Sequence, residues 1–309
     1  MPPASLPRDA ALLAELTPVV EALLERHLAQ AKEWFPHEIV PWSRGRDYEP
    51  GVSWTPDDSL IELRPEVRSA LFVNLLTEDN LPYYFRTIEQ TYGRDGAWGE
   101  WVRRWTAEEG RHAIAIRDYL MLTRAIDPVG LERARMAQVQ CGQVPEPASP
   151  IDALAYVALQ ELATRISHLN TGKAVGEAAG YEGLKRVASD ENRHHLFYRD
   201  LVAKALEVDP SWTVQSIDRQ VRSFEMPGTG IIDYTEHAKA IARAGIYDFA
   251  VHHDQILQPV LVTHWKLDRI EGLDADGEAA RASVLRYMER VGKAGRRTAA
   301  RREALAAAV

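Results

Sequence analysis

The stretch Glu-Glu-Gly-Arg-His at residues 108–112 has a close counterpart, Asp-Glu-Asn-Arg-His, at residues 190–194. In both stretches a glutamate precedes a histidine by three positions. Residues i and i+3 lie about one turn apart on the same face of an α-helix, so the two side chains can reach one metal ion. Each stretch therefore predicts a metal-binding helix.

A single glutamate precedes each unit at nearly the same distance. Glu78 lies 31 residues before Glu109, and Glu161 lies 30 residues before Glu191. This spacing fits a helix, a turn and most of a second antiparallel helix. Two lone glutamates with two Glu-x-x-His units form the ligand set of a carboxylate-bridged di-iron centre in a four-helix bundle. The sequence thus predicts an all-α, ferritin-like four-helix bundle with flanking helices and six metal ligands: Glu78, Glu109, His112, Glu161, Glu191 and His194.

The repeat decides between a metal site and an ordinary charged surface. One Glu-x-x-His unit is weak evidence, because these residues are common on solvated helices. Two units, each preceded by glutamate at a matching distance, favour the metal site. Carboxylates suit iron, and imidazole completes a set that leaves positions open for dioxygen. Two iron ions are the expected cofactor.

Composition and charge narrow the class of protein. The chain has 309 residues, 46% hydrophobic residues and a net charge of −8, so binding to nucleic acid or to an anionic membrane is not favoured. Its one cysteine, Cys141, excludes a disulfide within the chain and a cysteine-ligated cluster. No segment reaches the roughly 18 apolar residues of a membrane span, and the N-terminal segment lacks a signal-peptide pattern. We expect a cytoplasmic protein without a membrane span.

Helical periodicity predicts one domain over residues 1–309. The N-terminal helix and loop take residues 1–63, the metal-binding bundle about 64–208, and C-terminal helices 209–309. Within the bundle we expect helices at about 64–92, 97–123, 151–176 and 182–207, with a break at Gly180-Tyr181 and a long crossover between the second and third. Residues 226–230 predict a loop, and the arginine-rich tail 289–302 a frayed, solvated end.

The segment 35–65 is rich in proline and glycine and contains Trp42 and Trp54. It is either a structured surface loop or an aromatic cover over a buried site. The loop is favoured, because such a composition is typical of irregular surface segments.

The residues around the predicted ligands carry a family resemblance. Residues 76–82 read Leu-Thr-Glu-Asp-Asn-Leu-Pro, residues 105–112 read Trp-Thr-Ala-Glu-Glu-Gly-Arg-His, and residues 160–168 read Gln-Glu-Leu-Ala-Thr-Arg-Ile-Ser-His. With residues 190–194 and Met226-Pro227, these stretches resemble the motifs of the soluble acyl-acyl-carrier-protein desaturases, the stearoyl-carrier-protein desaturase family of plastids and actinobacteria. The resemblance covers about residues 30–235.

The resemblance implies roles for individual residues. It implies that Glu109 and Glu191 bridge the two irons, and that Thr164 lies beside the oxygen-binding pocket. The plainer alternative for Thr164 is a hydroxyl bonded back to a helix carbonyl. Thr164 and Asp190 are the expected catalytic residues.

Further residues are expected around the ligands. Asp190 and, by the internal repeat, Glu108 are candidates to accept the other N–H of a ligating histidine. The resemblance adds Arg193 to this outer layer and implies that Trp34 is a surface-side tryptophan on an electron route. His168 is expected to make a structural hydrogen bond, and His195 to point away from the metal face.

Two departures from the family pattern stand out. Gly110 replaces the usual asparagine and costs about 1 kcal/mol relative to alanine in a helix, which predicts close packing or a local distortion there. The helix face that lines the fatty-acid tunnel in the family carries Thr87, Gln90 and Thr91. These side chains make the tunnel wall polar or turn away from it, which leaves room for a functionalised acyl chain.

The implied function is O2-dependent insertion of a cis double bond into an acyl chain on acyl carrier protein, in fatty acid biosynthesis. Expected partners are acyl carrier protein, a ferredoxin-like or flavin-dependent electron donor, and a second copy in a homodimer. The acidic carrier would need a local basic patch, and the candidates are Lys173, Lys185, Arg186 and the C-terminal arginines.

Four alternatives stay open. The same scaffold could hydroxylate a carrier-bound acyl chain, or store and oxidise iron as a ferritin-like protein, although this chain continues long past His194. A radical-generating ribonucleotide reductase subunit would need a nearby tyrosine, such as Tyr83, Tyr84 or Tyr119. A metal-free interaction protein is disfavoured by the complete ligand set.

Overall fold

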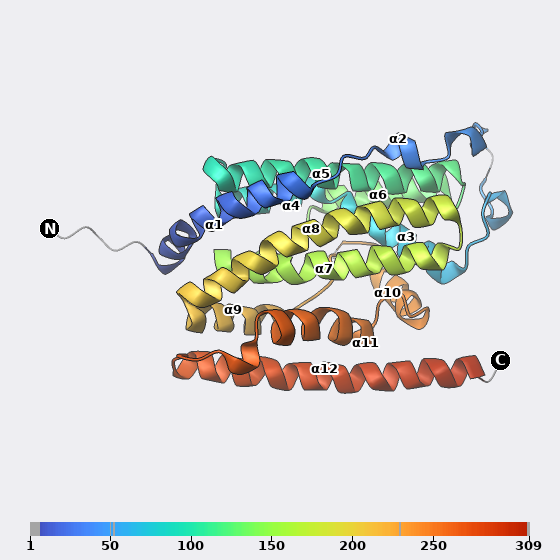
Figure 1. Cartoon of the computed structure of the whole chain (residues 1–309). Helices are drawn as coiled ribbons and strands as arrows, with labels where there is room; N and C mark the ends of the chain where they lie inside the picture. Colours follow the sequence, from blue (N-terminus) through green and yellow to red (C-terminus); the bar gives the residue numbers. More distant parts are fainter. Residues whose placement is uncertain (1–6, 50, 52, 229, 308–309) are drawn as a thin grey trace.

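The computed structural model of the chain describes residues 7–49, 51, 53–228 and 230–307, with side chains through residue 304. The described residues form helices, and no strand occurs among them (Figure 1). The predicted all-α fold is therefore confirmed. The bundle consists of α3 (Pro65–Glu78) continued by α4 (Leu81–Tyr92), α5 (Gly96–Leu122), α7 (Pro150–Val175) and α8 (Ala178–Val208), and α6 (Pro128–Cys141) lies in the crossover.

The first bundle element differs from the prediction. The helix expected at 64–92 is two helices, because the chain breaks at Asp79 and Asn80. Pro82 lacks an N–H group and occupies the first turn of α4, where helices tolerate proline. The side-chain amide of Asn80 donates a 2.9 Å hydrogen bond to the carbonyl of Gln143 in the crossover. Glu78 is consequently the last residue of α3, at the break.

The connection between α7 and α8 also lies earlier than predicted. α7 ends at Val175, and the next residue, Gly176, has a left-handed φ of 70° that suits glycine. The Glu177 carboxylate caps α8 by accepting the backbone N–H of Gly180 at 2.9 Å. Gly180 is thus inside α8, where a Cβ atom would lie 2.5 Å from the hydroxyl of Tyr119. Close helix packing, and not a chain break, explains this glycine.

The N-terminal segment lies against the outside of the bundle. α1 (Arg8–Gln30) packs along α5 and α8 (Figure 1). The segment after it contains only α2 (Pro36–Ile39) and two short 3₁₀ turns, η1 (Trp42–Arg44) and η2 (Pro56–Asp58). The Trp54 indole donates to the carbonyl of Arg124 at 2.9 Å, and Trp42 is 51% exposed. Both tryptophans belong to a structured surface loop, the favoured interpretation.

The C-terminal third is more regular than predicted. α9 (Pro210–Arg222), α10 (Tyr234–Arg243), α11 (Phe249–Val251), the π-helix η3 (His252–His264) and η4 (Leu267–Arg269) lead to α12 (Ala275–Ala307). The loop predicted at 226–230 is irregular where described, and Thr229 lies outside the described residues.

The prediction of a frayed tail at 289–302 is wrong. This stretch is part of the helix α12, where a Cβ at Gly295 would lie 2.7 Å from the Cα of Ala250. Arg302 also pairs with Asp248 at 2.5 Å. The sequence prediction counted the arginines and missed the close helix contact.

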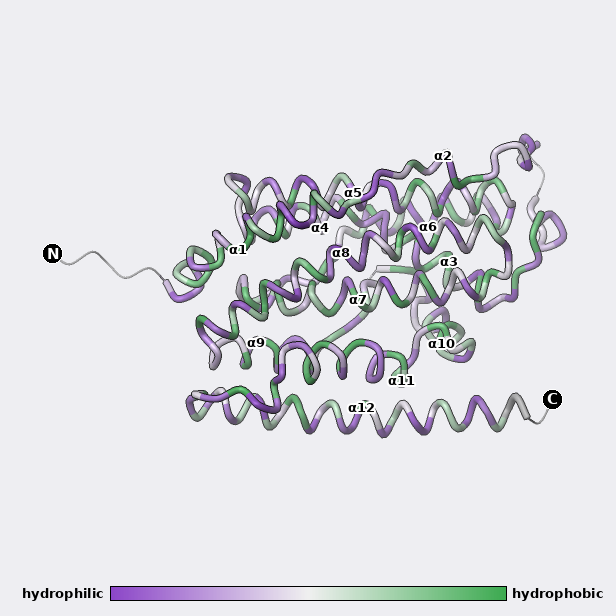
Figure 2. The backbone as a smooth tube through the Cα atoms, viewed as in Figure 1, coloured by the Kyte–Doolittle hydropathy of each residue, from purple (hydrophilic) through white to green (hydrophobic). Residues whose placement is uncertain are grey.

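Hydrophilic and hydrophobic residues alternate along the long helices α8 and α12 (Figure 2). Across the described ranges, no helix combines the length and the hydropathy needed to span a membrane.

Candidate metal centre

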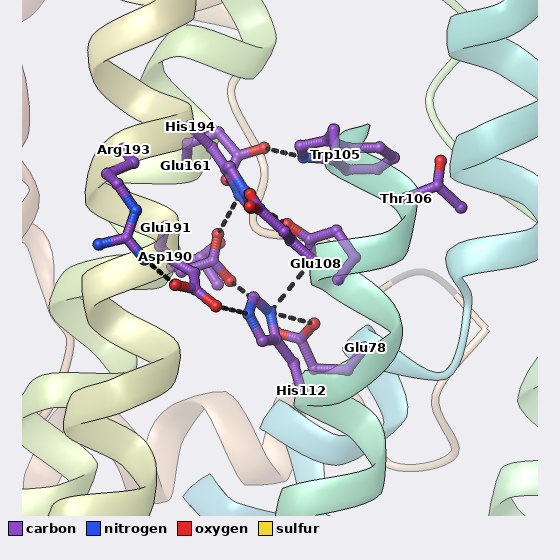
Figure 3. Close-up of polar contacts among 12 residues, drawn as sticks. Glu78, Trp105, Thr106, Glu108, His112, Glu161, Asp190, Glu191, Arg193 and His194 are labelled. Carbon is purple, nitrogen blue, oxygen red and sulfur yellow. Dashed lines mark hydrogen bonds and ion pairs between the residues drawn. The ribbon is translucent and has the colours of Figure 1, made fainter. Parts of the chain in front are cut away.

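The six predicted ligands meet inside the bundle. Glu109 comes from α5. Figure 3 shows the others: Glu78 from the end of α3, His112 from α5, Glu161 from α7, and Glu191 and His194 from α8. All six are buried; Glu109, the most exposed, is at 7%. Their ligand atoms form two groups, each within 4.8 Å, and both groups contain Glu109 and Glu191. These two carboxylates, the pair expected to bridge, lie between the other four ligands.

Several atoms of this group lack a hydrogen bond. Within the described chain, Nδ1 of His112, Nδ1 of His194 and Oε1 of Glu109 have no hydrogen-bond partner. Nδ1 of His194 lies only 2.8 Å from Oε1 of Glu109, and Nδ1 of His112 lies 3.3 Å from Oε2 of the same residue. Buried polar atoms without partners are costly. A cation between the imidazoles and carboxylates would satisfy them, so four carboxylates and two imidazoles fit two iron ions.

Each helix supports the histidine of the other. Asp190 on α8 lies 3.3 Å from Nε2 of His112 on α5, and Glu108 on α5 lies 2.9 Å from Nε2 of His194 on α8. Carboxylates only accept, so Nε2 of each ring carries a hydrogen, and Nδ1 is the atom that faces the other candidate ligands. The structure thus places both outer carboxylates where the repeat predicted them.

Asp190 has three further donors. Arg193 pairs with it from the same helix (Figure 3). Nη2 of Arg111 lies 2.9 Å away, and the indole N–H of Trp34 donates at 2.8 Å. Trp34 is only 3% exposed, so its expectation as a surface-side residue is wrong: the guanidinium of Arg111 covers the ring. Sequence reasoning missed Arg111, although its place in the repeat matches that of Arg193.

Glu108 has a different set of donors. Nε of Arg104 lies 2.7 Å from Oε1, and Nε2 of His27 lies 2.9 Å from Oε2. His27 belongs to α1, outside the bundle. Nothing in the repeat points to it, because only the packing of α1 brings it to the site.

Burial and charge shift the titration of this group. Burial lowers the pKa of His112 and of His194, but the surrounding carboxylates more than offset it, and both pKa values lie well above the ordinary one. Burial, together with Glu109 and Glu161, raises the pKa of Glu191 well above its usual range. The metal-free centre therefore holds extra protons, which binding of a cation would displace.

The two candidate ligands outside the Glu-x-x-His units, Glu78 and Glu161, also have hydrogen-bond partners. Nε2 of His168 lies 2.8 Å from Oε1 of Glu78, and the Trp105 indole donates to Oε1 of Glu161 at 3.1 Å. His168 makes the hydrogen bond expected of it, here to a candidate ligand. Nδ1 of His195 bonds the carbonyl of Ala158 at 2.7 Å, and His195 is in neither group of candidate ligand atoms.

A cavity of ≈ 100 Å³ borders the carboxylate group. It lies between α4, α5 and α7, and the crossover residues 144–147 line it on one side. Thr87 and Thr91 line it, whereas Gln90 is exposed. The lining positions on α7 extend from Ala153 to Thr164, a length of about 16 Å along a helix.

Thr164 borders this cavity and a second one of ≈ 70 Å³. Thr77 and Pro227 border both cavities too, and the Thr77 hydroxyl donates to the Pro227 carbonyl at 2.7 Å. The Thr164 hydroxyl donates back to the carbonyl of Gln160 at 2.9 Å and accepts from its side-chain amide at 2.7 Å. Thr164 therefore makes the bond to a helix carbonyl that was the alternative to a role beside the oxygen-binding pocket, and it also lines the cavity.

The expected close packing at Gly110 is wrong. Among described residues outside its own helix backbone, the atom nearest to a built Cβ is Cδ2 of Leu81, at 4.0 Å. Gly110 lies within α5, so no positive φ requires glycine either. Nothing in the structure explains this glycine.

Comparisons with known proteins agree with this geometry. The family model described as fatty acid desaturase matches residues 8–308. The chain is 44% identical over 294 residues to DesA1 of Mycobacterium tuberculosis, which is named as an acyl-acyl-carrier-protein desaturase; the match covers 91% of this chain and 86% of DesA1.

A plant relative and a solved structure extend the comparison. The chloroplastic stearoyl-acyl-carrier-protein 9-desaturase 6 of Arabidopsis thaliana is 32% identical over 295 residues, covering 84% of this chain and 74% of that protein. The X-ray structure of DesA2 from Mycobacterium tuberculosis H37Rv matches with a TM-score of 0.68 and 30% identity, over 82% of this chain and 94% of DesA2. The family model and these identities show that the chain belongs to the fatty acid desaturase family.

Proposed function

We propose that the chain is a di-iron, O2-dependent desaturase that inserts a cis double bond into an acyl chain carried on acyl carrier protein. One observation carries the proposal: four candidate ligand carboxylates, Glu78, Glu109, Glu161 and Glu191, form part of the wall of the elongated cavity. A chain in this cavity would pass directly beside the metals. Family membership supports the reaction, and the names of the relatives support the carrier.

The reaction takes two hydrogens from neighbouring carbons. A saturated –CH2–CH2– unit, O2, two electrons and two protons give –CH=CH– and two waters. The bound irons would supply the oxidising power for both hydrogen removals. We assign the six converging residues as their ligands, with Glu109 and Glu191 as bridges.

The protein's own residues position the substrate and exclude water. Ile88, Val157 and Trp105 give the cavity an apolar wall beside the carboxylates. The Thr164 hydroxyl needs only to leave the Gln160 carbonyl to donate into the cavity, and the Gln160 amide holds its oxygen meanwhile. Asp190 and Glu108 hold His112 and His194 in the tautomer that ligates.

We assign the second cavity to the carrier side of the substrate. Figure 1 shows the end of α7, the start of α8, α10 and the end of α12 at one end of the molecule. Tyr234, Ala238 and Ile241 of α10 line this cavity. Lys173 and Arg186 are exposed at the same end and suit an acidic carrier, whereas Lys185 pairs with Glu182 and Arg302 with Asp248.

The remaining parts of the proposal rest on the resemblance. The path from Trp34 through Asp190 to His112 is the proposed electron route, with a ferredoxin-like or flavin-dependent donor. A homodimer and a cytoplasmic location complete the proposal; the reducing cytoplasm suits the exposed, free Cys141. Family membership disfavours iron storage and the radical-generating alternative.

Product analysis tests the reaction. The purified protein is loaded with ferrous iron and given reductant, O2 and a panel of acyl carrier protein thioesters. Loss of two hydrogens from the acyl chain is the expected result, and gain of one oxygen would mean hydroxylation. Glu161→Ala should abolish the product, while Glu100→Ala, on the exposed face of α5, should retain it. Iron oxidation without any acyl product would overturn the proposal.

A further inference from the structure

We propose that His27 of α1 is a positioning residue for the metal centre: it holds Glu108, and through Glu108 it orients His194. The inference rests on the ligand set proposed above. His27 lies in α1, outside the four-helix bundle and outside the two Glu-x-x-His units.

The geometry centres on one oxygen. Oε2 of Glu108 lies 2.9 Å from Nε2 of His27 and 2.9 Å from Nε2 of His194. A carboxylate oxygen accepts, so the Nε2 atom of each ring must carry a hydrogen. Oε1 of the same carboxylate is held by Arg104 at 2.7 Å. Glu108 is therefore fixed from three directions, and its position fixes the ring of His194.

The cost of burying His27 argues against simple space filling. His27 is 4% exposed, and across the described chain its Nδ1 atom has no hydrogen-bond partner. An orphaned polar atom lowers stability, which a phenylalanine ring of similar size would avoid. The ring packs edge-on against Trp101 at 5.0 Å and stacked over His194 at 5.9 Å. Among the described residues the ring has one hydrogen-bond partner, Glu108, so that bond accounts for a histidine at this position.

The placement of His27 ties the centre to the N-terminal segment. His27 supports the carboxylate behind His194, and Trp34, seven residues later, supports the carboxylate behind His112. Carboxylates behind a ligating histidine set its tautomer and its donor strength. Docking of α1 and the residues after it therefore completes the outer contacts of both metals.

Cobalt binding to the full-length protein tests this role. Co2+ is titrated against a coloured chelator, and the visible absorption of bound Co2+ reports its ligand geometry. His27→Phe keeps the ring and loses the donor, and it should weaken one of two bound Co2+ ions about 10- to 100-fold and change its spectrum. His27→Gln offers an amide N–H to Glu108 and should recover most of the affinity. His237→Phe is the matched control: His237 lies on α10, where its ring faces Phe72 of α3, and the variant should bind Co2+ like the parent protein.

A double-mutant cycle separates positioning from packing. If His27 acts through Glu108, then His27→Phe should add little to the loss caused by Glu108→Gln. Additive losses, or two Co2+ ions bound by His27→Phe with unchanged affinity and spectrum, would overturn the inference. Should His27→Phe fail to fold, His27→Gln is measured in its place. A Co2+ affinity near that of the parent protein then supports the role, and a loss as large as that of Glu108→Gln contradicts it. A parent protein that binds no pair of Co2+ ions would instead overturn the ligand set itself.

Discussion

The α5 and α8 halves of the candidate centre share the pattern acid-Glu-x-Arg-His but are held differently. On α8, Asp190 is held by Arg193, Arg111 and Trp34 behind the histidine of α5. On α5, Glu108 is held by Arg104 and His27 behind the histidine of α8. The inner ligands follow the repeat, whereas much of the outer support comes from the non-repeated segment 27–34. A duplicated motif thus sets which atoms of the proposed ligands converge but not how firmly each is held.

The two carboxylates proposed as bridges should show the largest effect and no difference between the halves. Glu109→Ala and Glu191→Ala each remove a carboxylate common to both ligand groups, so each variant should bind at most one metal ion per chain. Metal content after reconstitution, measured by elemental analysis, checks this, with Glu100→Ala as control. Two ions at full occupancy in either variant would show that the ligand assignment is wrong.

Substitutions of the two outer carboxylates, Asp190 and Glu108, should cost different amounts of folding free energy. Asp190→Asn leaves Arg111 and Arg193 without their anion and should cost about 3 kcal/mol of folding free energy, together with a 10- to 100-fold loss of metal affinity. Glu108→Gln leaves one arginine, Arg104, without its anion, and that side chain is 39% exposed, so the loss of stability should be smaller. Denaturant unfolding of both metal-free variants measures the difference. Equal losses would mean that the halves are held equally.

His195 gives the α8 half a titrating group where α5 has Ala113. Burial lowers the pKa of His195 to about 4. Unfolded histidine titrates near pH 6.5, so between these values the unfolded chain binds a proton that the folded chain does not. Stability therefore falls as the pH drops through this window, by about 2 kcal/mol between pH 7 and pH 5 for this group.

His195→Asn retains a donor for the Ala158 carbonyl and removes the titration. Between pH 7 and pH 5, the free energy of unfolding of this variant should fall by about 2 kcal/mol less than that of the parent protein. Denaturant unfolding of the metal-free proteins at both pH values measures this. Parallel pH profiles for the two proteins would contradict the shift.

Gly110 should give the smallest effect. Alanine fits at this position, because the nearest outside atom lies 4.0 Å from a built Cβ, and it favours the helix. Gly110→Ala should stabilise the protein by about 0.4–1 kcal/mol in thermal or denaturant unfolding. Gly180→Ala on α8 is the opposite control and should destabilise it, since the Cβ would collide with Tyr119. Destabilisation by Gly110→Ala would show a constraint that the packing does not reveal.

Local spacing was enough to predict the bundle and the converging ligands. The i, i+3 pairs predict which side chains share a helix face. The glutamates about 30 residues before them predict the length of a helix, a turn and a second helix. Neither inference depends on the exact residues at which the helices end. The break at Asp79 and Asn80 was not predicted; there Asn80 bonds Gln143, 63 residues later in the crossover. The helical tail depends on the contact of Gly295 with Ala250, and His27 reaches Glu108 only through the packing of α1. Such contacts between distant segments leave no periodic signal in the sequence.

The crossover between α6 and α7 has a consequence for how relatives can diverge. Residues 144–147 form part of the cavity wall but carry none of the proposed ligands, and Asn80 secures the neighbouring Gln143. Substitutions, insertions or deletions in this short loop can reshape this wall of the cavity while the helices that carry the proposed ligands stay in place. Substrate preference can therefore change through mutations in this loop at little risk to the proposed metal centre, so the fold lets the two properties evolve separately.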